Sequence, residues 1–129
     1  MSSSKQIIET ANAPAPIGPY NQAIQAGNTL YISGQIPIDP ATGELVSGSL
    51  EDEAHQVLKN VGAVLEAAGY RFADVVKTSI FLRDMNDFAA VNAVYGTYFT
   101  EAEPARETVA VAGLPKNVNV EISVIAWKA

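Results

Sequence analysis

Hydrophobic and polar residues repeat along this chain with two spacings, one typical of strands and one typical of helices. The clearest strand pattern covers residues 118–127, where apolar residues alternate with residues of mixed polarity. The clearest helical pattern covers residues 54–68, where apolar residues recur at intervals of three and four. Each pattern marks a buried face, so we expect strands and helices around a shared core.

Local signals predict where the other elements begin and end. Ser49 is a favourable N-cap for the first helix, three acidic residues follow it, and Gly69 can end the helix in a left-handed conformation. Gly27-Asn28 separates two short strand-like runs, which is typical of a β-hairpin. The remaining predicted elements are hairpin strands over residues 20–25 and 29–33, a turn-rich loop over residues 39–48, a strand over residues 75–82, a helix over about residues 87–99 ended by Pro104, and a strand over residues 108–112.

The order of these elements predicts a mixed sheet that is covered on one side. Strand–helix–strand steps imply parallel strands with right-handed crossovers. If both crossovers have the same hand, both helices lie on one face of the sheet. We therefore expect an α+β fold with a mixed β-sheet of about six strands and two helices on one face, formed by residues 1–129 as a single domain.

The other face of this sheet is too apolar for full exposure to water. In the last strand, Val120 and its alternate neighbours belong under the helices, which leaves Glu121, Ile125 and Trp127 on the second face. We assign Ala110 and Ala112 of the neighbouring strand to that second face. An apolar surface of this kind is typical of a subunit contact. We expect a homo-oligomer whose sheets pack face to face, with Glu121 near the subunit boundary.

Composition narrows the classes of function. The chain is 48% hydrophobic and 17% charged, as in globular proteins, and 14 acidic against 8 basic residues give a net charge of −6. That charge disfavours nucleic acid as a partner, because phosphate backbones are also negative. No apolar run approaches the roughly 20 residues of a membrane span, and residues 1–5 lack an apolar signal core. We expect a cytoplasmic protein without a membrane partner.

The chemistry must come from few residue types. There is no cysteine and one histidine, His55, which we expect to be half-exposed on the first helix, so we expect no metal site and no cofactor. Arg106 could hold a carboxylate with its planar fork, although a surface pair with Glu103 or Glu107 is the simpler interpretation of the spacing. Glu121 could act as a general base, although an exposed strand glutamate is again simpler.

Five short motifs follow one another along nearly the whole chain. They are Gly18-Pro19-Tyr20-Asn21-Gln22-Ala23-Ile24, Ile32-Ser33-Gly34-Gln35-Ile36-Pro37, Val91-Asn92-Ala93-Val94-Tyr95, Pro104-Ala105-Arg106 and Val120-Glu121-Ile122. No single motif is diagnostic, but in this order they closely resemble the motifs of the Rid (reactive intermediate deaminase) family.

The resemblance implies a chorismate-mutase-like fold and a homotrimer with three active sites between subunits. It implies hydrolysis of 2-iminopropanoate and 2-iminobutanoate, which arise from enamines released by pyridoxal-phosphate dehydratases, to 2-oxo acids and ammonia. Such an activity would limit damage by reactive metabolites and needs no cofactor. By resemblance, Arg106 binds the substrate carboxylate and Glu121 positions the water. The substrate-binding residues that it implies are Tyr20, Ser33, Gly34, Asn92, Arg106 and Thr108.

Two positions depart from the family pattern, and other functions stay open. Glu107 follows the arginine where family members usually have a small or apolar residue, and Thr108 stands where many have cysteine. Because neighbours on a strand point to opposite faces, we expect Glu107 to face away from Arg106 and to affect substrate preference more than activity. The alternatives are a non-catalytic module that binds a small carboxylate, an RNA-cleaving translation inhibitor, which the net charge of −6 disfavours, and a holdase chaperone.

Overall fold

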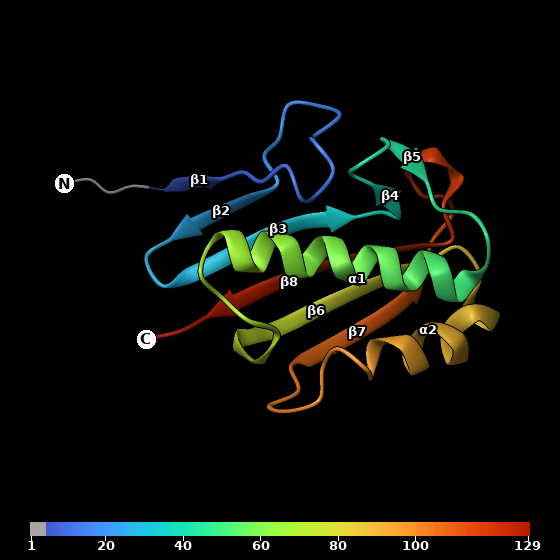
Figure 1. The fold of residues 1–129 in the computed structure, drawn as a ribbon. Helices are drawn as coiled ribbons and strands as arrows, with labels where there is room; N and C mark the ends of the chain where they lie inside the picture. The colour runs from blue at the N-terminus through green and yellow to red at the C-terminus, as the bar shows by residue number, and fades with distance from the viewer. Residues whose placement is uncertain (1–4) are drawn as a thin grey trace.

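The fold is a six-stranded mixed sheet with two α-helices, seen in a computed structural model that describes residues 5–129 (Figure 1). Across the sheet the strands are ordered β1-β2-β3-β8-β6-β7. The elements are β1 (Gln6–Ile8), β2 (Ala23–Ala26), β3 (Thr29–Gln35), a separate hairpin of β4 (Ile38–Asp39) and β5 (Glu44–Leu45), α1 (Leu50–Ala67), β6 (Val75–Leu82), α2 (Phe88–Tyr95), β7 (Ala105–Ala110) and β8 (Val120–Trp127). The prediction that residues 1–5 lack an apolar signal core falls on residues outside the described part of the chain, except for Lys5.

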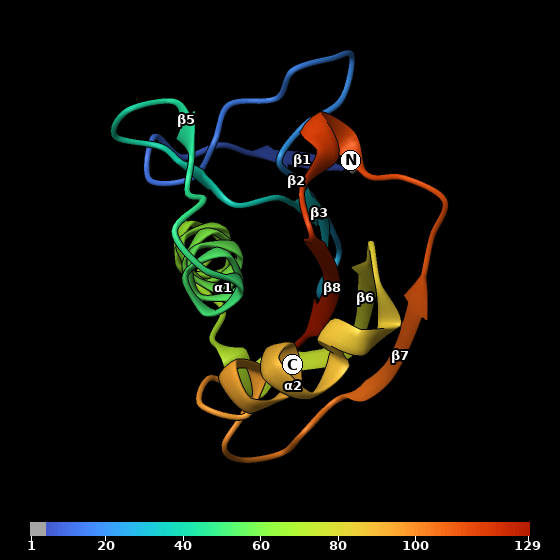
Figure 2. The ribbon, with the colours of Figure 1, turned by 90° about the vertical axis from the view of Figure 1, so that its right-hand side faces the viewer.

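Both helices lie on the same face of the sheet, as the element order predicts (Figure 2). The side chains of Val57, Leu58 and Val61 in α1 are fully buried, and so are Val120 and Ile122 in β8. The alternation predicted for residues 118–127 is therefore confirmed from Val120 onward, with every second side chain of β8 under the helices, while Val118 precedes the strand and packs with Ile36 and Ile38. Within residues 5–129, neither helix is long and apolar enough to cross a lipid bilayer.

The local signals at the predicted helix and turn act as expected. The Ser49 hydroxyl accepts a hydrogen bond from the Asp52 N–H at 3.1 Å, which caps α1. Gly69 has a φ of +81°, and the Tyr70 N–H returns to the Leu65 carbonyl at 2.9 Å, as in a Schellman motif. The hairpin turn between β2 and β3 has Gly27 at a φ of +61°, a conformation that favours glycine.

The predicted strand–helix–strand steps do join parallel strands: β6 and β7 pair directly, and β3 and β6 run parallel on either side of β8, to which both are antiparallel. The ends of two further elements differ from the prediction. α2 ends at Tyr95 instead of Phe99, because the chain tightens into turns in which the Thr97 hydroxyl donates to the Val94 carbonyl at 2.7 Å. β7 begins at Ala105 instead of Thr108, because it pairs along β6 from its first residue.

The register of β7 also corrects the prediction for the open face of the sheet. Leu82 of β6 pairs with Ala110, so Ala110 points toward the helices. Val109 takes the place on the open face that we had assigned to Ala110, and Ala112 lies beyond the strand. Trp127, 50% exposed, does lie on the open face with Ile125. The open face therefore carries apolar side chains, with valine in place of alanine in β7, but it also carries the polar side chains of Lys77, Ser79 and Glu107.

Candidate functional site

Glu121 lies on the open face of the sheet, above a glycine of the neighbouring strand. Its register partner in β6 is Phe81, and its neighbours in β8 are buried on the helix side. A Cβ atom on Gly34 of β3 would stand 2.8 Å from the Glu121 Cδ, so the carboxylate occupies space that only glycine leaves free. Burial raises the pKa of Glu121 above its ordinary value, because it disfavours the charged form. A carboxyl group with a raised pKa suits proton transfer near neutral pH.

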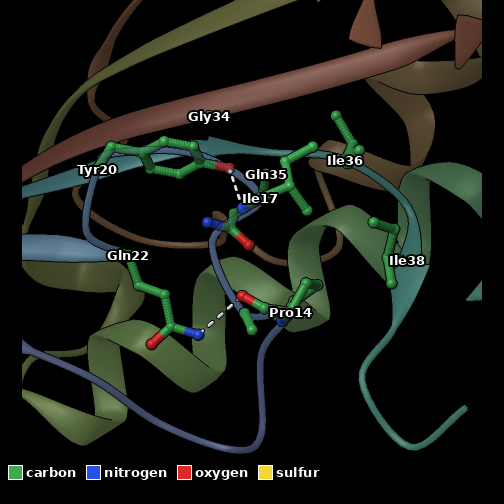
Figure 3. Close-up of a pocket in the computed structure, with 9 residues that line it drawn as sticks. Pro14, Ile17, Tyr20, Gln22, Gly34, Gln35, Ile36 and Ile38 are labelled. Atoms are coloured by element: carbon green, nitrogen blue, oxygen red, sulfur yellow. Dashed lines mark hydrogen bonds between the residues drawn. The ribbon is translucent and has the colours of Figure 1, made fainter. Parts of the chain in front are cut away.

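Tyr20 and Ser33 lie beside Gly34, where β3 departs from regular pairing. The β3–β8 register shifts between Ile32 and Gln35. The Ser33 hydroxyl donates to the Asn21 carbonyl at 2.7 Å, and the Tyr20 hydroxyl accepts from the Ile17 N–H at 3.3 Å. Tyr20 and Gly34 line a pocket of about 30 Å³ (Figure 3). Tyr20 precedes the hairpin instead of lying on it, because its N–H turns back to the Gly18 carbonyl at 2.8 Å.

Gln22 organises the loop before Tyr20, and sequence reasoning missed it. Its side chain is 3% exposed. Its Nε2 donates to the carbonyls of Thr10, Ala13 and Pro14 at 3.0, 3.1 and 2.9 Å, and its Oε1 accepts from the Thr10 N–H at 2.7 Å. The available signal was its place in the first motif, but a single glutamine in a loop does not indicate burial. Gln22 therefore supports the pocket wall without a predicted role.

Arg106 lies on the helix side of the edge strand β7, against one face of α2. Its register partner is Thr78 of β6, which faces the helices. Its Nη1 donates to the Asn92 Oδ1 at 2.7 Å. The guanidinium carbon lies 5.6 Å from the centre of the Phe88 ring and 4.9 Å from the centre of the Tyr95 ring. These three α2 residues are spaced four and three apart, so they share the helix face that contacts the arginine.

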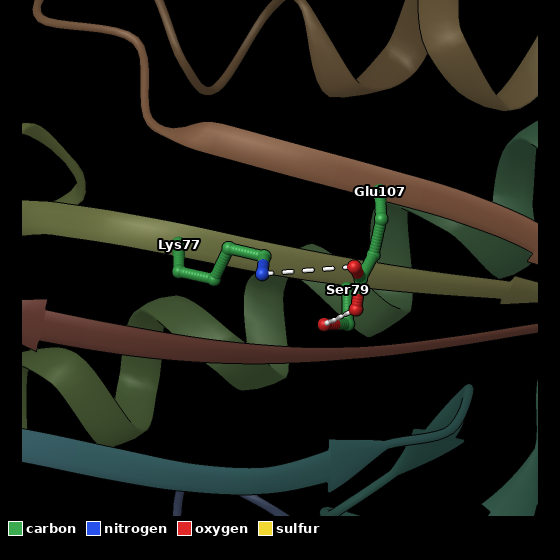
Figure 4. Close-up of polar contacts among 3 residues, drawn as sticks. All are labelled: Lys77, Ser79 and Glu107. Carbon is green, nitrogen blue, oxygen red and sulfur yellow. Dashed lines mark hydrogen bonds and ion pairs between the residues drawn. The ribbon is translucent and has the colours of Figure 1, made fainter.

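The ion pairs expected of an ordinary surface arginine do not form here. Glu107 points from the opposite side of β7, as predicted, where its Oε1 lies 3.6 Å from the Lys77 Nζ and its Oε2 accepts from the Ser79 hydroxyl at 3.2 Å (Figure 4). Within residues 5–129, Arg106 forms an ion pair with neither Glu103 nor Glu107. Its exposed positive charge is therefore available to an anionic ligand.

The structure separates the predicted site residues into two groups. Arg106, Asn92 and Thr108 lie on the helix side, where the buried Thr108 hydroxyl has no hydrogen-bond partner among the described residues. Gly34 and Glu121 meet on the open face, with Tyr20 and Ser33 beside Gly34. One copy of the chain therefore does not bring Arg106 and Glu121 to a common ligand. His55 lies apart from both groups and its Nδ1 is 2.9 Å from the Tyr98 hydroxyl.

Comparison with known proteins places the chain among close relatives. A sequence model of the family described as Endoribonuclease L-PSP matches residues 10–128. A RutC family protein of Pyrococcus horikoshii is 59% identical over 96% of this chain and 98% of its own. A mouse protein named 2-iminobutanoate/2-iminopropanoate deaminase is 52% identical over 95% of this chain and 90% of its own. A Yersinia pestis structure of the Rid protein family has a TM-score of 0.94 at 51% identity, and the match covers 97% of this chain and 100% of that one. E. coli TdcF with bound serine has a TM-score of 0.91 at 44% identity, and the match covers 96% of this chain and 99% of that one.

Proposed function

This chain belongs to the Endoribonuclease L-PSP family, which includes the Rid proteins, and from that premise we propose that it hydrolyses 2-imino acids to 2-oxo acids and ammonia. The resemblance drawn from the five motifs is thereby confirmed at the level of the family. The proposed substrates are 2-iminopropanoate and 2-iminobutanoate, which the name of the mouse relative supports. The observation that carries the proposal is an arginine held in place without an acidic partner, together with a half-buried glutamate of raised pKa.

Arg106 binds the substrate carboxylate in this proposal. A guanidinium offers parallel N–H groups that match the two oxygens of a carboxylate. The Asn92 Oδ1 accepts from Nη1, which holds this end of the side chain beside α2. Serine, the molecule bound in E. coli TdcF, also carries a carboxylate and a nitrogen on the next carbon, so a small 2-amino or 2-imino acid fits the comparison.

Glu121 activates water for attack on the imine carbon. The carboxylate takes a proton as the water oxygen bonds to C2, which gives a tetrahedral carbinolamine. Protonation of the nitrogen then lets ammonia leave as the C–N bond breaks and the carbonyl forms. One imino acid and one water thus become one 2-oxo acid and one ammonia. General-base assistance of this kind contributes on the order of 10²- to 10⁴-fold.

A homotrimer with active sites between subunits is part of the proposal. Arg106 and Glu121 lie on opposite faces of the sheet, so one ligand can reach both only if the open face of one copy meets the β7 edge of another. The exposed Tyr31 and Trp127 on the open face support burial in such a contact. A closed ring of three copies satisfies both conditions. Light scattering should give three times 13.6 kDa, and a monomer at micromolar concentration would contradict the shared site.

A non-catalytic module that binds a small carboxylate is the second candidate. The contacts of Arg106 serve binding as well as turnover, and Glu121 alone argues for hydrolysis. The RNA-cleaving alternative matches the description of the family but conflicts with a net charge of −6.

Adding the purified protein to a threonine dehydratase reaction tests the proposal. We expect 2-iminobutanoate to decay faster in proportion to the protein added, with an unchanged final yield of 2-oxobutanoate. Unaccelerated decay, together with binding of 2-oxobutanoate in calorimetry, would refute the deaminase and favour the binding module. Unaccelerated decay without binding would refute both.

A further inference from the structure

Tyr95 lies beside Arg106 and is held firmly on several sides. Its side chain is 6% exposed. Its hydroxyl lies 3.0 Å from the Oγ1 of Thr78, which is fully buried in β6. The Phe99 ring stacks on the Tyr95 ring with 4.3 Å between centres and 22° between planes. The ring therefore has a fixed orientation relative to both the sheet and α2.

Arg106, by contrast, has few contacts of its own. Its side chain is exposed, and the bond from Nη1 to Asn92 is the single hydrogen bond it donates within residues 5–129. One hydrogen bond restrains one end of a guanidinium but leaves its plane free to turn. A carboxylate is bound by two parallel N–H groups only when the two planes match.

We propose that Tyr95 is a positioning residue whose ring sets the plane of the Arg106 guanidinium. The guanidinium carbon lies 4.9 Å from the centre of this buried ring, and 5.6 Å from the exposed Phe88 ring. A cation this close to an aromatic face is attracted by the ring and is oriented by it. Tyr95 then acts on the substrate through Arg106, without touching it. The identity of the ligand in this inference rests on the proposed function, while the orientation of Arg106 does not.

Substitutions at Tyr95 and Thr78 distinguish the role of the Tyr95 ring from that of its hydroxyl group. Tyr95→Leu removes the ring, Tyr95→Phe keeps the ring without the bond, and Thr78→Val removes the same bond from the other side. With 2-oxobutanoate as the probe in isothermal titration calorimetry, Tyr95→Leu should raise the Kd about fivefold, as loss of a cation–ring contact at an exposed arginine implies. The other two variants should stay within about twofold of the wild type, because their ring remains in place.

Tyr70 provides a matched control for the loss of a buried tyrosine. Its side chain is 4% exposed, its hydroxyl donates to the Asn28 carbonyl at 2.8 Å, and the Lys128 Nζ lies 5.1 Å from its ring centre. Tyr70→Leu thus removes the same groups and a similar cation contact at the β2–β3 turn. We expect it to lower the Tm about as much as Tyr95→Leu and to leave the Kd for 2-oxobutanoate unchanged.

A measurement on Arg106 itself needs no ligand. Nitrogen-15 relaxation of the Arg106 Nε–H group should show greater mobility in Tyr95→Leu than in the wild type, Tyr95→Phe or Tyr70→Leu. If Arg106 stays equally rigid in a folded Tyr95→Leu protein, or if Tyr70→Leu weakens binding as much, the positioning role is wrong. A wild type that binds 2-oxobutanoate but hydrolyses no imine would refute the proposed function alone. In that case the rigidity of Arg106 and the Kd values would still decide the role of the ring.

Discussion

Replacing Gly34 by alanine should displace the Glu121 carboxylate from its place on the open face. The new Cβ would stand 2.8 Å from the Glu121 Cδ and 3.0 Å from its Cγ, so the glutamate or the strand must move. Positive φ values occur among the described glycines at Gly27, Gly43 and Gly69, and not at Gly34. The backbone therefore accepts alanine at this position, and the substitution probes the steric clash alone.

The magnitude follows from the atoms that collide. Adding a methyl group to a filled site costs about 1–3 kcal/mol, and a flexible glutamate that can turn away places this one near 1 kcal/mol. When Glu121 is first truncated to alanine, the Cγ and Cδ are gone, so Gly34→Ala should cost close to nothing. The coupling between the two substitutions should therefore be about 1 kcal/mol, within the usual range for side chains in contact. Turnover of Gly34→Ala should fall by about 10²-fold or more, because the general base is misplaced.

Urea denaturation of the wild type, Gly34→Ala, Glu121→Ala and the double variant measures this coupling. Protomer concentration must be equal in all four, because the stability of an oligomer depends on it. Gly113→Ala is the matched control, since a Cβ there meets no atom within 4 Å. If Gly34→Ala destabilises the protein equally with and without the Glu121 side chain, the clash is not the cause and the reasoning fails.

Three further predictions concern the two charged residues of the proposed site. Arg106→Ala should lower kcat/KM for 2-iminobutanoate by roughly 30-fold to several thousand-fold, since losing a desolvated charge-assisted pair costs about 2–5 kcal/mol. Arg106→Lys should recover little of this activity, because an ammonium group lacks the planar fork. A folded alanine variant with near wild-type imine decay would contradict this prediction. Glu121→Gln should lower kcat while the Kd for 2-oxobutanoate changes little, and undiminished turnover would remove Glu121 from the mechanism. Burial raises the pKa of Glu121, so the folded state binds the carboxyl proton more tightly than the unfolded state does. The contribution of Glu121 to the free energy of unfolding therefore falls as pH rises through the raised pKa. The gain in Tm from Glu121→Gln should therefore be larger at about pH 7 than at about pH 4, and equal gains would show that the pKa is not raised.

Features decided by neighbours in the chain could be predicted from the sequence. Ser49 and Gly69 marked the ends of α1, because capping involves residues within one turn. Alternation over residues 118–127 predicted which side chains of β8 are buried, because a strand turns each successive side chain to the other face. The motif order identified the family, which the comparisons confirm.

Pairings between distant residues could not be predicted in this way. The insertion of β8 between β3 and β6, and the pairing of Leu82 with Ala110, depend on hydrogen bonds between segments far apart in sequence. Without that register, Ala110 was assigned to the wrong face.

In the candidate site, too, the sequence predicted which residues take part, and the tertiary structure decided where they lie. The motifs named Arg106 and Glu121, but the tertiary structure alone placed them on opposite faces of the sheet and set Arg106 against Tyr95. The direction of a strand side chain relative to the rest of the fold is set by the register with the next strand and by the helix that packs on it. Both are contacts that form only when the chain has folded.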